Sequence, residues 1–128
     1  MTIQTGQAVL LVDDEAEFAS TLAERLNLRG FSASVALDGE SALARLEEED
    51  FDLVLLNVML PGMHGIEVLR RIRESYPALP VILLTGQAGA KDGIEGMKQG
   101  AGGYLTKPVD LHELLELAAS LGMEADHA

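Results

Sequence analysis

Five polar residues stand where apolar runs of the sequence end, and their types would suit the binding of a hard cation and a phosphoryl group. They are Asp13, Asp14, Asn57, Thr85 and Lys107. Adjacent carboxylates are oxygen ligands of the kind that Mg²⁺ binds, usually together with several waters. A lysine and a hydroxyl facing that cation would suit the oxygens of a phosphoryl group. Taken singly, each residue is typical of an ordinary turn, cap or loop, so the prediction of a site depends on their lying together.

The elements that would position these residues alternate along the chain. Short apolar runs, which are typical of strands, occupy residues 8–12, 53–56 and 81–84, and residues 31–36 and 104–106 are also predicted to be strands. Runs that are apolar throughout predict strands buried on both faces of a sheet. Five strand–helix units with short connections predict an α/β fold, a doubly wound five-stranded parallel sheet with helices on both faces. Ligands of such sheets bind beyond the carboxyl ends of the strands, where all five polar residues fall.

Apolar residues at helical spacing predict helices between and after the strands. These sets are Phe18, Leu22 and Leu26; Ala42, Leu43 and Leu46; Ile66, Leu69, Ile72 and Tyr76; and Leu111, Leu114, Leu115, Ala118 and Leu121. Asp14 is predicted to cap the first helix, with Glu17 completing a capping box. In the third helix, Arg70, Arg71 and Arg73 are predicted to point largely outward.

Segment 91–99 predicts a poorer helix because Gly93 and Gly96 interrupt it, each at a cost of about 1 kcal/mol relative to alanine. Further glycines occur at positions 86, 89, 100, 102 and 103. One interpretation is a short or frayed helix, because glycine raises the entropic cost of ordering the backbone. The other is that these glycines serve turns and close packing. Amide hydrogen exchange over 91–99 would separate the two.

Composition limits the partners and the location that the sequence predicts. The 128 residues include 21 acidic and 9 basic side chains, a net charge of −12. This acidic excess predicts neither nucleic acid nor an anionic membrane as a direct partner, because few cations are present to neutralise phosphates. There is no cysteine, and no apolar stretch approaches the ~18–20 residues of a membrane span. The N-terminus lacks a basic signal-peptide region, so we expect a cytoplasmic protein.

Four segments make the chain resemble the receiver domains of two-component response regulators. They read LVDDE at 11–15, DLVLLNVMLPGM at 52–63, VILLTG at 81–86 and GYLTKP at 103–108, and the resemblance extends from about 8 to 121. It implies a flavodoxin-like sheet of strand order 2-1-3-4-5, in a single domain spanning 1–128 with short flexible tails. It also implies a phosphorylation-dependent switch rather than an enzyme. The implied partners are a histidine kinase or phosphotransfer protein, a downstream protein target, and a second copy that would dimerise through the fourth helix, fifth strand and last helix.

The resemblance also assigns roles at the strand ends. Asp13, Asp14, the side chain of residue 57 and the backbone carbonyl of Met59 would bind Mg²⁺. Residue 57 would also be the aspartate that attacks phosphorus, but here it is Asn57.

Other positions would respond to the phosphoryl group. Thr85 and Lys107 would contact its oxygens, and Tyr104 matches the aromatic residue that turns inward when the threonine hydroxyl is drawn to the phosphate. His64 stands where the family varies, and we interpret it as an exposed loop residue.

The carboxamide of Asn57 changes what the site can do. An amide is not a useful nucleophile toward phosphorus, and the flanking Leu56 and Val58 carry no hydroxyl. We therefore predict no acyl phosphate at this position, and weaker Mg²⁺ binding because three carboxylates become two. Losing one of three crowded charges also relieves repulsion. Without metal, the chain is therefore predicted to be at least as stable as an Asn57→Asp variant.

Several alternatives remain open. The asparagine is either a deliberate substitution that holds the domain unphosphorylated, which the intact remainder of the set favours, or the mark of a natural pseudo-receiver. The few residues after Leu121 suggest a stand-alone receiver, although a fragment of a longer regulator fits equally. An aspartyl-nucleophile phosphatase would have one residue between its acids, whereas Asp13 and Asp14 are adjacent. A flavodoxin-like FMN carrier would want a Ser/Thr/Gly-rich loop after the first strand.

Overall fold

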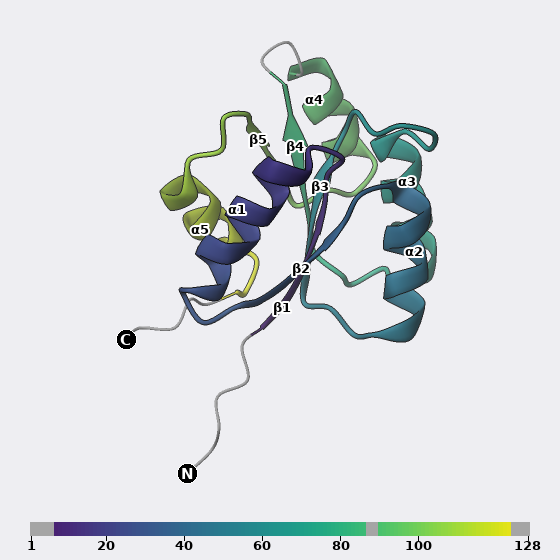
Figure 1. The fold of residues 1–128 in the computed structure, drawn as a ribbon. Coiled ribbons are helices and arrows are strands. Elements are labelled where there is room, and N and C mark those ends of the chain that lie inside the picture. Colours follow the sequence, from purple (N-terminus) through teal and green to yellow (C-terminus); the bar gives the residue numbers. More distant parts are fainter. Residues whose placement is uncertain (1–6, 87–89, 124–128) are drawn as a thin grey trace.

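The computed structural model describes residues 7–86 and 90–123, and its strands form one parallel sheet. The strands are β1 (Ala8–Val12), β2 (Ser32–Ala36), β3 (Leu53–Asn57), β4 (Val81–Thr85) and β5 (Gly103–Thr106), in the order β2-β1-β3-β4-β5 (Figure 1). Each strand lies within one residue of its predicted bounds. The predicted fold class and strand order are therefore confirmed.

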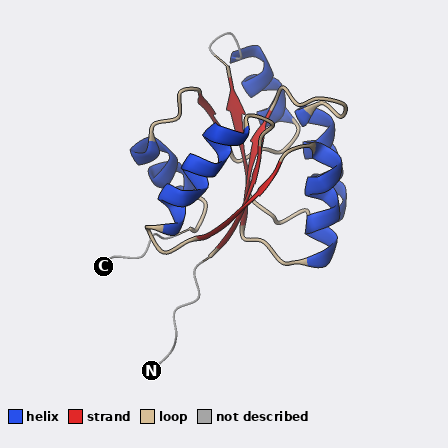
Figure 2. Ribbon diagram, viewed as in Figure 1, coloured by secondary structure: helices blue, strands red, loops and turns tan. Residues whose placement is uncertain are grey.

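Helices cover both faces of the sheet, as the apolar periodicity predicted. They are α1 (Ala16–Asn27), α2 (Gly39–Glu48), α3 (Gly65–Ser75), α4 (Ala90–Lys98) and α5 (Leu111–Ser120). Figures 1 and 2 show α1 and α5 together on one face, with α2 and α3 on the other. No helix among the described residues is long and apolar enough to span a membrane. Of the predicted flexible tails, residues 1–6 and 124–128 lie outside the described residues, whereas Met123 is buried in the core.

Two apolar clusters, one on each face, hold the layers together. Because successive side chains of a strand point to opposite faces, Val9 and Leu11 of β1 join the cluster that contains residues of α1 and α5. Leu10 and Val12 join the cluster that contains residues of α2 and α3. All residues of β3 and β4 are buried, which explains why their sequences are apolar throughout until the carboxyl end.

Two local predictions are wrong. Asp14 does not cap α1: the N-cap residue is Glu15, without a side-chain hydrogen bond, and the preceding turn is closed by Asp13 Oδ1, which accepts from the Glu15 N–H at 2.9 Å. Arg73 does not point outward like Arg70 and Arg71. It is half-buried, because the loop after α3 places the carbonyls of Pro77 and Leu79 where the Arg73 guanidinium donates to them.

The glycine-rich segment forms a helix in close contact with the sheet. A Cβ added at Gly93 would lie 2.6 Å from the ring of Tyr104, and one at Gly96 would overlap the side chain of Leu83. These contacts favour the close-packing interpretation of both glycines. Gly89 lies outside the described residues, and whether α4 frays stays a prediction.

Candidate functional site

The carboxyl edge of the sheet brings most of the predicted residues together. Asp13 follows β1, Asn57 and Thr85 end β3 and β4, and Lys107 follows β5. Parallel pairing places these ends at the same edge. Asp13 and Thr85 are almost completely buried, and Asn57 is 6% exposed. Polar groups buried in this way need partners, so the contacts among them decide what the site can do.

Asn57 is the centre of a hydrogen-bond network. Its Nδ2 donates to the Met59 carbonyl at 3.0 Å, to Asp14 Oδ1 at 3.3 Å and, at 3.5 Å, to Asp13 Oδ1. These three acceptors are groups that the resemblance to receiver domains implies as ligands of Mg²⁺. The amide therefore turns its nitrogen, and not its oxygen, toward them.

Lys107 forms ion pairs with two carboxylates of the site. Its Nζ lies 2.7 Å from Asp13 Oδ2 and 2.6 Å from Glu15 Oε1. The same ammonium lies 4.6 Å from the centroid of the Phe18 ring, a cation–π distance. Burial by itself would lower the pKa of Lys107, but hydrogen bonds to the two carboxylates outweigh it and the pKa is raised. Lys107 is thus held as a cation against the buried carboxylate.

Thr85 and Tyr104 stand apart from this network. The Thr85 hydroxyl donates to the Leu105 carbonyl at 3.5 Å, a weak hydrogen bond, and the Thr85 carbonyl accepts from the Lys107 N–H at 2.7 Å. Tyr104 is half-buried and packs beside Gly93 of α4. Among the described residues, neither side chain has a polar contact with Asn57. Their predicted roles toward a phosphoryl group stay predictions.

Three residues that shape the site were not predicted from the sequence to take part in it. Glu15 and Phe18 contact Lys107, although they belong to the first strand's loop and α1. Gly65 lets the start of α3 approach the backbone after β3, since a Cβ there would lie 2.5 Å from the Asn57 carbonyl oxygen and 2.7 Å from Val58. The sequence signal for Gly65 was a glycine between the turn that begins at Pro61 and the apolar periodicity of the third helix. His64 is exposed as predicted, and its Nδ1 also caps α3 by accepting from the Ile66 N–H.

The donor set suits Mg²⁺ only in part. Two carboxylates and a carbonyl are appropriate oxygen ligands. Among the described residues, however, no group of three or more His, Cys, Asp or Glu side chains is arranged to hold a metal. Predicted ligation by the oxygen of Asn57 would require its amide to turn over. Asp13 is also already paired with Lys107.

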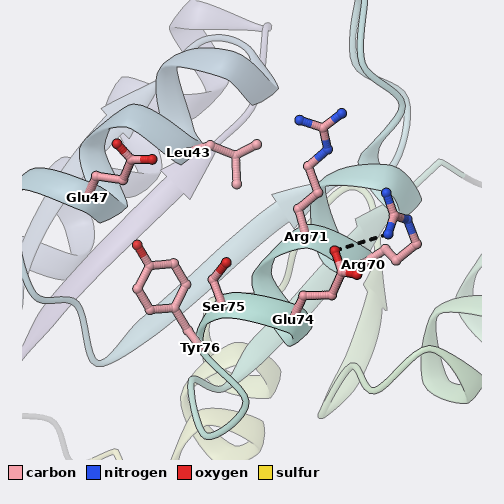
Figure 3. Close-up of a pocket in the computed structure, with 7 residues that line it drawn as sticks. All are labelled: Leu43, Glu47, Arg70, Arg71, Glu74, Ser75 and Tyr76. Atoms are coloured by element: carbon pink, nitrogen blue, oxygen red, sulfur yellow. Dashed lines mark hydrogen bonds and ion pairs between the residues drawn. The ribbon is translucent and has the colours of Figure 1, made fainter.

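A surface pocket between α2 and α3 lies away from these residues. Its lining is Leu43, Glu47, Arg70, Arg71, Glu74, Ser75 and Tyr76 (Figure 3). Its two arginines are already in ion pairs: Arg70 with Glu67 and Glu74, and Arg71 with Glu67. None of the predicted site residues reaches this pocket, so we assign it no part in the site.

The chain is similar to regulators about twice its length. The transcriptional regulatory protein CpxR of Klebsiella pneumoniae is 44% identical over 107 residues, which cover 84% of this chain and 45% of that protein. The uncharacterized transcriptional regulatory protein YkoG of Bacillus subtilis is 42% identical over 107 residues, covering 84% and 47%. The chain therefore spans about half the length of these relatives.

The prediction that nucleic acid is not a partner is wrong in the light of these relatives, which are transcriptional regulatory proteins. Its physical basis was the net charge of −12. That charge describes this segment alone and says nothing of the remaining half of the relatives' length.

Comparison with solved structures and comparison with protein families both point to receiver domains. The receiver domain of the Francisella response regulator 1452 superposes with a TM-score of 0.83 at 31% identity, covering 91% of this chain and 96% of that one. A response regulator receiver domain protein from Clostridium thermocellum gives a TM-score of 0.86 at 28% identity, covering 90% and 93%. Residues 9–119 match the response regulator receiver domain. Since that match covers most of the sequence, the chain belongs to the family of two-component receiver domains.

Proposed function

We propose that this chain is the receiver part of a longer transcriptional regulator, and that it does not form an acyl phosphate at position 57. The observation that carries the proposal is the orientation of Asn57: its nitrogen is engaged by two carboxylates and a carbonyl. A carboxylate oxygen could attack phosphorus there, but an amide nitrogen, whose lone pair is delocalised, cannot do so usefully. Output would then come from protein contacts rather than from catalysis.

The remaining residues support a phosphoryl site that lacks its nucleophile. Lys107 is held as a cation beside Asp13. Asp13, Asp14 and the Met59 carbonyl would hold Mg²⁺, more weakly than three carboxylates would. Bound Mg²⁺ would supply positive charge to phosphoryl oxygens. The role of Lys107 would be to hold the same oxygens from the β5 side.

The partners and the location belong to the same proposal. A histidine kinase or phosphotransfer protein would contact the carboxyl edge of the sheet, in the cytoplasm. A second copy would contact the face of α4, β5 and α5, where Ile94 and Met97 are exposed apolar side chains. Action at DNA would come through the part of the regulator beyond the matched residues, as the relatives' names suggest.

Intact mass after incubation with Mg²⁺ and acetyl phosphate tests the proposal. We expect no phosphoryl group on this chain and one phosphoryl group on Asn57→Asp. The double variant Asn57→Asp, Lys107→Met serves as the control, because it has the carboxylate at position 57 but lacks the lysine of the pocket. A phosphoryl group on this chain would contradict the missing-nucleophile proposal. No modification of either form would contradict the claim that the rest of the site is intact.

A further inference from the structure

Asn57 is more than the loss of a nucleophile, because its amide nitrogen lies against each group expected to hold the cation. The Met59 carbonyl, Asp14 Oδ1 and Asp13 Oδ1 all accept from Nδ2, at 3.0, 3.3 and 3.5 Å. We propose that the Asn57 carboxamide substitutes for the divalent cation and orders this pocket without metal. The inference rests on the proposed function in one respect: it takes these three groups as the cation's ligands.

The surroundings dictate which way the amide points. Every one of these three partners is an acceptor, so only the NH₂ end of the side chain can satisfy them. Turning the amide over would place its oxygen against two carboxylates and a carbonyl, and would leave both N–H donors without these partners. Since Asn57 is 6% exposed, water could make up little of that loss.

The buried charge of the pocket already has a counter-charge. Asp13 is completely buried, and its oxygens are engaged by Lys107 and by the Glu15 N–H. Asp14 is exposed, so its charge is solvated. The task left for a cation is to draw Asp14 and the Met59 carbonyl toward Asp13, and the Asn57 amide makes these links.

Loop geometry makes the arrangement specific to this position. Gly65 N–H donates to the Val58 carbonyl at 2.8 Å, and a Cβ at Gly65 would collide with that backbone. The start of α3 therefore lies directly against the backbone of Val58, next to the Met59 carbonyl that accepts from Asn57. Mg²⁺ would have to break three hydrogen bonds and turn the amide before it could use the oxygen of Asn57.

The first test compares thermal unfolding of this chain, Asn57→Leu and Asn57→Asp, each in EDTA and in millimolar Mg²⁺. Leucine keeps the shape of asparagine without its donors, so we expect a midpoint lower by about 4 °C in EDTA. We also expect Asn57→Asp to be no more stable than this chain in EDTA and to gain stability from Mg²⁺, whereas this chain gains little. Equal midpoints for this chain and Asn57→Leu, or an equal gain from Mg²⁺ in this chain and Asn57→Asp, would overturn the proposal.

A second measurement needs no variant. The sequence has two asparagines, and Asn27 is a matched control: it is exposed, its oxygen accepts from the Ala33 N–H, and its nitrogen makes no hydrogen bond among the described residues. NMR should find slower side-chain amide hydrogen exchange at Asn57 than at Asn27. Equally fast exchange at both residues would overturn the proposal.

The two proposals fail in different ways. If Asn57→Asp neither binds Mg²⁺ nor becomes phosphorylated, the proposed function fails. The amide links themselves would still be judged by Asn57→Leu in EDTA and by the exchange at Asn57. If those two readouts fail while Asn57→Asp is phosphorylated, the proposed function stands and the cation substitute does not.

Discussion

Lys107→Met would remove the cation that faces the one completely buried carboxylate among the described residues. Asp13 Oδ2 lies 2.7 Å from Nζ, and the Asp13 side chain has no exposed surface. Methionine preserves the apolar length of the side chain beside Phe18, so the change isolates the charge. The expected result is loss of stability, because the carboxylate stays buried without its counter-charge.

The structure sets the size of that loss. Removing one partner of a buried ion pair typically costs about 3–5 kcal/mol. Asp13 keeps the Glu15 N–H as a donor, and the Lys107 side chain is 17% exposed, so water can reach the vacated end. We therefore expect the low end, about 3 kcal/mol. Over 128 residues the entropy of unfolding is about 0.27 kcal/mol/K, so the melting midpoint should fall by about 11 °C.

Urea unfolding at neutral pH is the appropriate assay, with the free energy of unfolding obtained by linear extrapolation. The raised pKa of Lys107 means that its contribution is fully present below pH 10.5 and is lost only as the pH rises through the folded-state pKa. Neutral pH therefore measures the whole effect.

Two control variants separate the buried ion pair of Lys107 with Asp13 from its exposed ion pair with Glu15. Glu15→Gln removes only the partner whose side chain is 62% exposed, and should cost about 0–1 kcal/mol. Adding Asp13→Asn to Lys107→Met should recover part of the loss, because the unpaired charge is then gone. If Lys107→Met costs no more than Glu15→Gln, the view of Asp13 as a carboxylate held by its lysine is refuted.

Two further predictions concern α4 and α3. Gly93→Ala would place a Cβ 2.6 Å from the Tyr104 ring, so we expect the ring to move toward solvent and the protein to lose about 1–3 kcal/mol; unchanged tyrosine fluorescence and stability would contradict this close packing. Hydrogen bonds from Arg70 and then Arg71 lower the pKa of Glu67 to about 2. Its contribution to stability is therefore present above the ordinary pKa of 4.5 and lost as the pH falls through about 2. A carboxyl NMR titration should find that low midpoint, and Arg70→Gln should raise it; a midpoint near 4.5 in the unaltered chain would refute these contacts.

Local patterns in the sequence were sufficient for the fold. The apolar runs and the helical spacing between them reflect burial, and burial is what a doubly wound sheet imposes on its central strands. Because parallel strands end at one edge, the same patterns gathered Asp13, Asn57 and Lys107. The proposal that position 57 lacks a nucleophile also depends on one residue type at one position, so the sequence alone could suggest it.

Side-chain orientation was decided only by the tertiary structure. The direction of the Asn57 amide depends on acceptors from two loops, and Lys107 meets a glutamate 92 residues away. Arg73 was predicted to be exposed because its spacing gave no sign of the loop carbonyls that bind it. Spacing along a chain reports which face a residue occupies, whereas the partner that satisfies a buried polar group is supplied by segments that meet only when the chain folds.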